Sequence, residues 1–119
     1  MTVVLIAIGG ATGGLARYGL GRLVETETLP WLTVGINVLG SFLLGFLVAT
    51  AAWLPREIRI ALAVGLLGGF TTFSTFSVDV FLELESGDAA QAAMLVAASV
   101  GFGVGAAAGG YFIGRRLAH

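Results

Sequence analysis

The stretch IALAVGLLGGFTTFSTFSV, which runs from Ile60 to Val78, decides the fold because it is apolar and carries no charge along its whole length. A helix that crosses the hydrocarbon core of a membrane needs roughly 20 apolar residues, and this stretch is of that length. Its middle, Gly68–Ser77, has paired glycines followed by threonines, which weaken helix propensity. The stretch predicts a membrane helix that is broken near its middle. The alternative is a continuous, glycine-softened helix whose hydroxyl groups bond to the preceding turn.

Three more apolar stretches flank this one. Trp31–Leu54 and Ala89–Gly114 carry no charge, and the uncharged run Met1–Ala16 continues as an apolar pattern to Val24. The first run lacks a basic segment before it, so we expect a transmembrane helix there rather than a cleaved signal peptide. Strands of a membrane barrel would alternate apolar and polar residues, and these runs do not. We therefore expect an all-α membrane protein with one domain, residues 1–119, and four transmembrane helices over about residues 2–24, 31–54, 57–83 and 88–115.

The composition suits lipid as the solvent. Of the 119 residues, 57% are hydrophobic and only 11% are charged, whereas a soluble domain has about 25% charged residues. The net charge is −1 and there is no basic run, so we expect no nucleic-acid partner. The chain has no cysteine, and its single histidine is the last residue, His119, where a frayed tail is expected. No cluster of a nucleophile, a base or metal ligands is present, so we do not expect an enzyme.

The arginines favour one orientation weakly. With four helices, both termini and the second loop lie on one side of the membrane, and four of the six basic residues lie there. Positive charge favours the cytoplasmic side, so the N-terminus is expected inside. The bias is modest, so insertion in both orientations stays open. The four are Arg56, Arg59, Arg115 and Arg116, and the others are Arg17 and Arg22.

Glycines spaced four apart occur in the first and last predicted helices. This spacing lets the backbones of membrane helices approach closely. Four short helices leave little interior for an aqueous path, so these rows predict either close contact within one chain or a dimer face. They comprise Gly9, Gly10, Gly13 and Gly14 in the first helix, and Gly101, Gly105 and Gly109 in the last.

Asn37 lies deep in the second predicted helix, within the segment Thr33–Ser41. An amide at this depth must face protein or water, because hydrocarbon offers it no partner. Polar groups inside a membrane are costly and mark functional sites by default. The alternative is a clamp between helices worth about 0.6 kcal/mol.

The third predicted helix carries aromatic rings and hydroxyl groups together. Phe73 and Phe76 are three residues apart and share one face of a helix. A ring has a negative face and a positive edge, so ring edges can coordinate an anion without a full charge. The neighbouring hydroxyls are neutral donors that can replace water around an anion. The alternative is that both rings fill core or lipid-facing volume. Unwound carbonyls in this helix would suit a hard cation such as Na⁺.

Three segments resemble the small fluoride channels called Fluc or CrcB: GATGGLARY (Gly10–Tyr18), NVLGSFLLG (Asn37–Gly45) and GGFTTFSTFS (Gly68–Ser77). The resemblance extends over the chain in length, helix count and motif order. It implies a channel that exports fluoride passively across the cell membrane and lowers cytoplasmic fluoride. It also implies an antiparallel, dual-topology dimer with two separate pores and a central structural Na⁺. The partner is either an identical chain or an inverted paralogue.

Residue by residue, the resemblance makes Asn37 the pore amide and Phe73 and Phe76 the rings that line fluoride sites. The main-chain carbonyls of Gly68 and Thr71 from both subunits would hold the Na⁺. The other residues that it assigns to the pathway are Arg17 and Thr33 in the vestibule and Ser74, Thr75 and Ser99 in a polar track.

The chain departs from the family pattern in two places. Asp79 stands where a glutamate often follows the third motif, and its shorter arm changes the reach of the carboxylate. On the last helix, Leu95 stands where a tyrosine often precedes Ser99 by one turn, and the tyrosine of this helix is Tyr111.

Two other classes of membrane protein share some of these features. A small multidrug antiporter has the same size and helix count but needs a proton-coupled carboxylate deep in a helix, and the first helix has none. A structural subunit of a larger complex would need neither Asn37 nor the hydroxyl-rich third helix at pore depth. Fluoride flux through the purified protein alone separates the channel from that subunit.

Overall fold

The computed structural model describes residues 1–118 and consists of helices and short connections over that range. His119, where we expected a frayed tail, lies outside the described residues. The α-helices are α1 (Thr2–Gly21), α2 (Leu29–Ala49), α3 (Arg56–Ile60), α4 (Gly68–Phe70), α5 (Phe73–Glu85) and α6 (Ala89–Ala118). Two short 3₁₀ turns, η1 (Thr26–Thr28) and η2 (Ala51–Trp53), and one π-helical segment, η3 (Ala61–Leu67), complete the chain.

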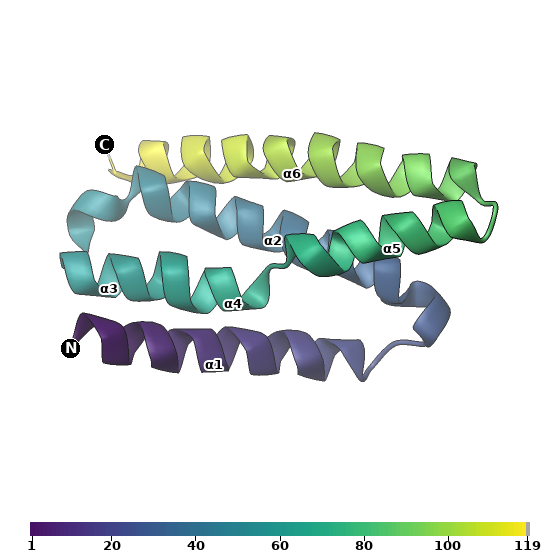
Figure 1. The fold of residues 1–119 in the computed structure, drawn as a ribbon. Coiled ribbons are helices and arrows are strands. Elements are labelled where there is room, and N and C mark those ends of the chain that lie inside the picture. Colours follow the sequence, from purple (N-terminus) through teal and green to yellow (C-terminus); the bar gives the residue numbers. More distant parts are fainter. Residues whose placement is uncertain (119) are drawn as a thin grey trace.

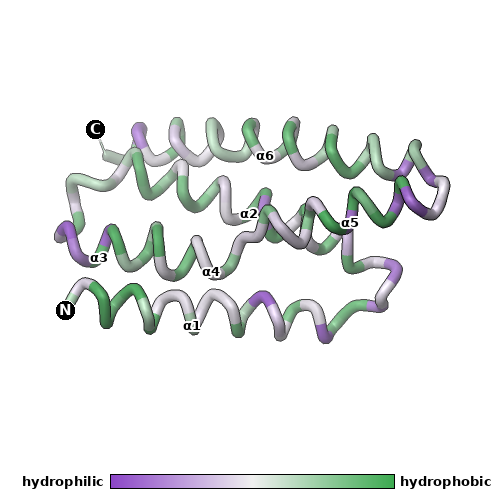
Figure 2. The backbone as a smooth tube through the Cα atoms, in the orientation of Figure 1, coloured by the Kyte–Doolittle hydropathy of each residue, from purple (hydrophilic) through white to green (hydrophobic). Residues whose placement is uncertain are grey.

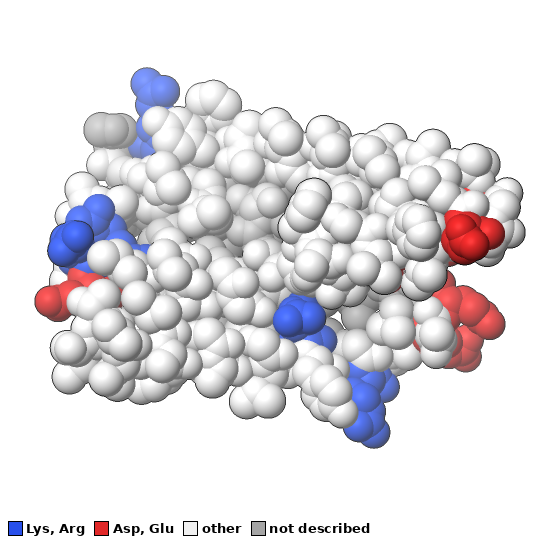
Figure 3. Space-filling view, viewed as in Figure 1, with Lys and Arg blue, Asp and Glu red and all other residues white. Residues whose placement is uncertain are grey.

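These elements form four segments that are long and apolar enough to cross a membrane, as the sequence predicted: Thr2–Gly21, Thr26–Ala49, Arg56–Glu85 and Ala89–Ala118. The long axis of the molecule measures 48 Å, which matches a bilayer of about 40–45 Å including its headgroups. Charged atoms gather at the two ends of this axis, and further arginine atoms lie on the face shown and at its lower edge (Figure 3). Between these ends, the helices consist mostly of residues of apolar or intermediate hydropathy, drawn green and white (Figure 2).

The ends of the first two helices come earlier in the chain than expected. We expected the first helix to reach Val24, whereas α1 ends at Gly21. We expected the second helix to reach Leu54, whereas α2 ends at Ala49. The Thr50 hydroxyl donates to the Phe46 carbonyl at 2.9 Å, which satisfies one end group of the helix. Leu54 is extended, as expected for the residue before a proline.

The helices form two packed groups that α5 joins (Figure 1). In the first group, α1 lies along η3 and α4, and in the second, α2 lies along α6. After α4 the chain crosses to α6, so α5 packs mainly on α6. Both termini lie at the same end of the molecule, where α3 begins (Figure 1).

Glycine makes close backbone contact possible within the first group. A Cβ on Gly9 would lie 2.8 Å from the Ala61 carbonyl oxygen, and one on Gly69 would lie 2.6 Å from the Gly10 carbonyl oxygen. Both distances are too short for any side chain, so these helices touch backbone to backbone. Gly9 and Gly10 of the first helix therefore serve contact within the chain, whereas nothing lies within 4 Å of a Cβ placed on Gly14.

The glycines of α6 divide into two rows. A Cβ on Gly110 would contact the Phe42 carbonyl of α2, whereas nothing lies within 4 Å of one on Gly101, Gly105 or Gly109. The second row therefore faces away from the chain. It adds to a large exposed apolar surface, as expected of a protein surrounded by lipid or by another subunit.

Candidate functional site

The site forms where the third span changes direction. Helix α4 ends at Phe70, the next two residues have extended backbones, and α5 begins at Phe73. Thr71 has φ −86° and ψ 157°, and Thr72 has φ −152° and ψ 120°. The paired glycines and following threonines are poor helix formers, which makes this the weakest place in the span.

Asn37 of α2 holds the extended segment in place. Its Nδ2 donates to the Thr72 carbonyl at 2.9 Å, and its Oδ1 accepts from the Thr72 N–H at 2.8 Å. One side chain thereby satisfies both main-chain groups of Thr72, which hydrocarbon could not do. An amide carries two N–H donors, so one donor remains for another partner.

Two carbonyl groups lose their helical partners next to this pair of hydrogen bonds between Asn37 and Thr72, here called the clamp. In a continuous helix the Thr72 N–H would donate to Gly68, and the Thr75 N–H would donate to Thr71. Instead, the Thr72 N–H donates to Asn37, and the Thr75 N–H donates to the Thr72 hydroxyl at 3.3 Å. The resemblance of the three motifs assigned these same two carbonyls, of Gly68 and Thr71, to a Na⁺ site.

A cavity of about 370 Å³, here called the Asn37 cavity, opens beside the clamp. It brings together four of the predicted pore residues, Asn37, Phe73, Phe76 and Ser99, and none of its lining residues is charged. The Ser99 hydroxyl is buried and has no hydrogen-bond partner within residues 1–118. The other lining residues are Gly40, Ser41, Leu44, Ala63, Leu67, Gly68, Thr71, Thr72 and Val100.

The two phenylalanines form one wall of the Asn37 cavity. Their ring centroids are 6.1 Å apart, and the ring planes are tilted by 54°. Phe76 is half-buried, whereas Phe73 is 78% exposed on the single chain. Phe73 is therefore not a core residue of this chain, and its ring is available to lipid, ion or partner.

The two residues predicted for a vestibule meet in a second cavity of about 480 Å³, here called the Arg17 cavity. Arg17 and Thr33 both line it, and the Arg17 Nε donates to the Gly69 carbonyl at 3.5 Å. Thr72 lines both cavities, so they adjoin at the clamp. Asp79 also lines the Arg17 cavity, and its Oδ2 is buried without a hydrogen-bond partner in the described chain.

Some predicted residues lie elsewhere. Thr75 lines the Arg17 cavity rather than the Asn37 cavity, and Ser74 lines neither, although its hydroxyl lies 3.4 Å from that of Thr72. Leu95 is only 1% exposed and belongs to the core. Ser41 lines the Asn37 cavity and was missed by the sequence analysis. Its position four residues after Asn37, on the same helix face, was the available signal.

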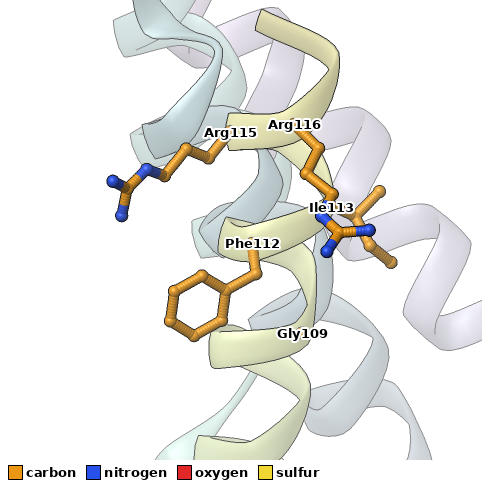
Figure 4. Close-up of a pocket in the computed structure, with 5 residues that line it drawn as sticks. All are labelled: Gly109, Phe112, Ile113, Arg115 and Arg116. Carbon is orange, nitrogen blue, oxygen red and sulfur yellow. The ribbon is translucent and has the colours of Figure 1, made fainter. Parts of the chain in front are cut away.

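A further cavity of about 740 Å³ lies at the end of α6 (Figure 4). Its lining is Gly109, Phe112, Ile113, Arg115 and Arg116. The two guanidinium groups extend in different directions from the helix (Figure 4). This cavity shares no lining residue with the Asn37 or Arg17 cavity, so it is not part of the candidate site.

Comparison with known proteins identifies the family. The family model described as "CrcB-like protein, Camphor Resistance (CrcB)" matches residues 4–111. A protein of Allorhizobium ampelinum named "Fluoride-specific ion channel FluC" is 42% identical over 97% of each chain. "Fluoride-specific ion channel FluC 1" of Nitrobacter hamburgensis is 44% identical over 97% of this chain and 96% of its own. A namesake from Thermus thermophilus is 42% identical over 96% and 95%.

The resemblance drawn from the three motifs is thereby confirmed. The relatives are named as ion channels, which are not enzymes, in agreement with the prediction from composition. Four helices long and apolar enough to span a membrane, in a family of ion channels, make this a multi-pass membrane protein. The chain belongs to the CrcB family.

Proposed function

We propose that this protein is a fluoride-specific ion channel that lets fluoride leave the cell passively across the cell membrane and so lowers cytoplasmic fluoride. The observation that carries this proposal is the Asn37 cavity, which combines neutral donors with aromatic rings at the middle of the third span. The names of the relatives point to the same ion.

The chemistry of the cavity suits a small, strongly hydrated anion. The free N–H of Asn37 and the hydroxyl of Ser99 can replace water molecules, and the edges of Phe73 and Phe76 add weak positive charge. A fully charged lining would bind fluoride tightly and hold it, whereas conduction needs binding weak enough to release the ion. No lining residue of the Asn37 cavity is charged, which favours release.

We further propose that two chains assemble in antiparallel orientation, either as a homodimer or with an inverted paralogue. Phe73 lines the Asn37 cavity and is 78% exposed, and a second subunit packed there would close this wall. Each chain brings one Asn37 cavity, which gives two pores per dimer. The outward row of Gly101, Gly105 and Gly109 offers α6 a further surface for close helix contact.

The sodium proposal rests on the carbonyls of Gly68 and Thr71. Hydrogen bonds of Thr72 and Thr75 are diverted elsewhere, which leaves both carbonyls available to a hard cation. Within residues 1–118, no group of three His, Cys, Asp or Glu side chains lies close enough to hold a metal. A structural Na⁺ at the dimer centre would therefore bind main-chain oxygens from both subunits.

The transport test uses purified protein in liposomes. We expect fluoride to leave the vesicles without a proton gradient and chloride to be strongly excluded, because the pathway offers neutral donors and no coupling carboxylate in its central cavity. Efflux is followed with ion-selective electrodes for the two anions. Fluoride flux that requires a proton gradient, or chloride flux of equal rate, would contradict the channel.

The sodium test uses size at Gly68. Thr71→Ser should keep dimer and flux, because it retains the hydroxyl that donates to Leu67 at 2.8 Å. Gly68→Ala should also be tolerated, because a Cβ there would lie 3.6 Å from the nearest atom, the Ala63 carbonyl oxygen. Gly68→Leu should weaken dimer assembly, measured by size-exclusion chromatography, and the wild-type dimer should be less stable in K⁺ than in Na⁺. A Gly68→Leu dimer as stable as wild type, together with equal dimer stability in Na⁺ and K⁺, would contradict this sodium site.

A further inference from the structure

A fourth cavity of about 400 Å³, here called the Arg59 cavity, lies between α2 and the first half of the third span. Arg56 and Arg59 of α3 line it together with apolar residues of α2 and η3. Helix α3 begins at the end of the molecule where both termini lie (Figure 1). The cavity thus lies towards the opposite end of the span from Asp79 and the Arg17 cavity.

The Arg59 side chain has an unmet hydrogen-bonding need. Its Nε is buried and has no hydrogen-bond partner within the described chain. A buried donor without an acceptor is costly, and a guanidinium group stays charged at all ordinary pH values. Glu57, the one carboxylate of α3, does not line the cavity. The cavity therefore presents positive charge and free donors, a combination that favours a small anion.

The Arg17, Asn37 and Arg59 cavities adjoin one another in this order through shared lining residues. The Asn37 cavity shares Leu44 and Ala63 with the Arg59 cavity and shares Thr72 with the Arg17 cavity. The central cavity is neutral, whereas each flanking cavity has two arginines in its lining: Arg17 and Arg22, with Asp79, on one side, and Arg56 and Arg59, with no carboxylate, on the other. A cleft lined by positive charge raises the local concentration of anions and their rate of arrival.

We propose that the Arg59 cavity is the entrance of the fluoride pathway at the opposite end from the Arg17 cavity, here called the Arg59 entrance. Arg59, aided by Arg56, binds fluoride there and passes it to the Asn37 cavity. This inference rests on the proposed function. It makes Arg59 a binding residue of the pathway rather than only a charge that fixes the orientation of the chain. The neutral centre then sets selectivity, while the flanking arginines set how fast fluoride arrives.

The test compares Arg59→Gln, Arg59→Lys and wild type in liposomes loaded with potassium fluoride. At low ionic strength, Arg59→Gln should reduce fluoride efflux at least about threefold, because electrostatic attraction to the Arg59 entrance is lost. Added potassium gluconate should shrink this difference, since salt screens charges beyond a distance of about 10 Å at 0.1 M. Arg59→Lys keeps the charge and should retain most of the wild-type flux.

Arg115→Gln is the matched control. It removes the same charge at the same end of the molecule but from the separate cavity of α6 (Figure 4), so its flux should equal that of wild type. Size-exclusion chromatography establishes that every variant is folded. Unchanged efflux in Arg59→Gln, or equal and salt-independent losses in Arg59→Gln and Arg59→Lys, would overturn the proposed role of the Arg59 cavity. Neither result would contradict the proposal that the protein is a fluoride channel. A wild-type protein that passes no fluoride would instead overturn both the proposed function and the proposed role of the Arg59 cavity.

Discussion

Replacing Gly13 by alanine is expected to remove most of the folded protein, although it adds only one methyl group. The new Cβ would contact the Leu66 carbonyl oxygen and would lie 2.8 Å from the Phe70 nitrogen and 3.1 Å from the Gly69 carbonyl carbon. All three are backbone atoms, so no side chain can rotate away. Helix α1 would have to separate from η3 and α4, at a cost of about 1–3 kcal/mol or more. Thermal unfolding in detergent and the yield of monodisperse protein measure this loss.

Gly19→Ala is the control for that experiment. Gly19 lies in the same helix, and nothing lies within 4 Å of a Cβ placed on it. The same chemical change should therefore leave yield and unfolding temperature unchanged or slightly raised, since alanine favours a helix over glycine. Equal stability of Gly13→Ala and Gly19→Ala would mean that α1 does not touch the third span as described.

The number of spans was predictable because hydrocarbon imposes a simple rule. A charged side chain is costly inside the membrane, so uncharged runs of sufficient length mark the helices. The ends of the helices were less predictable, because an uncharged sequence can also form a turn. The segment after Ala49 is as free of charge as the helix before it, yet the chain turns there. The Thr50 hydroxyl bonds back to the Phe46 carbonyl and Pro55 favours an extended Leu54, and hydropathy registers neither of these local features.

The sequence singled out Asn37, Phe73 and Phe76, which share one cavity, but it did not predict how they are arranged. Depth in the membrane singled out Asn37, and spacing singled out Phe73 and Phe76. The sequence offered two readings of Asn37, a pore amide or a clamp, and the structure places its oxygen and one N–H on Thr72. Which donor meets which acceptor depends on how α2 lies against the third span, a long-range relation that no local pattern encodes. The hydroxyl of Ser99 was assigned by resemblance alone.

The clamp also fixes the direction of the remaining N–H group of Asn37. Asn37 uses its oxygen and one N–H on the main chain of Thr72, so its geometry is fixed by the backbone. The remaining N–H then points from a rigid frame rather than from a mobile side chain. Donors held in advance lose no freedom when an ion arrives, which favours fast replacement of its water molecules.

Phe73→Ile and Phe76→Ile are each expected to reduce fluoride flux at least about tenfold while the protein still assembles. If the rings only filled volume, these apolar replacements would usually cost less than about 1.5 kcal/mol of stability and leave flux nearly intact. Isoleucine keeps an apolar surface but has no positive ring edge to offer an anion. Fluoride holds its water tightly, so each lost ligand raises the barrier to dehydration, and every ~1.4 kcal/mol on that barrier changes the rate tenfold.

The exposure of the two rings makes this comparison sharp. Phe73 is 78% exposed on the single chain, so Phe73→Ile removes little packing within the subunit, and a loss of flux there cannot be attributed to a collapsed core. Phe76 is half-buried, so its variant needs size-exclusion chromatography and thermal unfolding beside the flux measurement. Val78→Ile, an exposed position on the same helix that lines neither the Asn37 nor the Arg17 cavity, is the control and should conduct normally. Normal flux in a well-folded Phe73→Ile or Phe76→Ile dimer would assign that ring to packing alone.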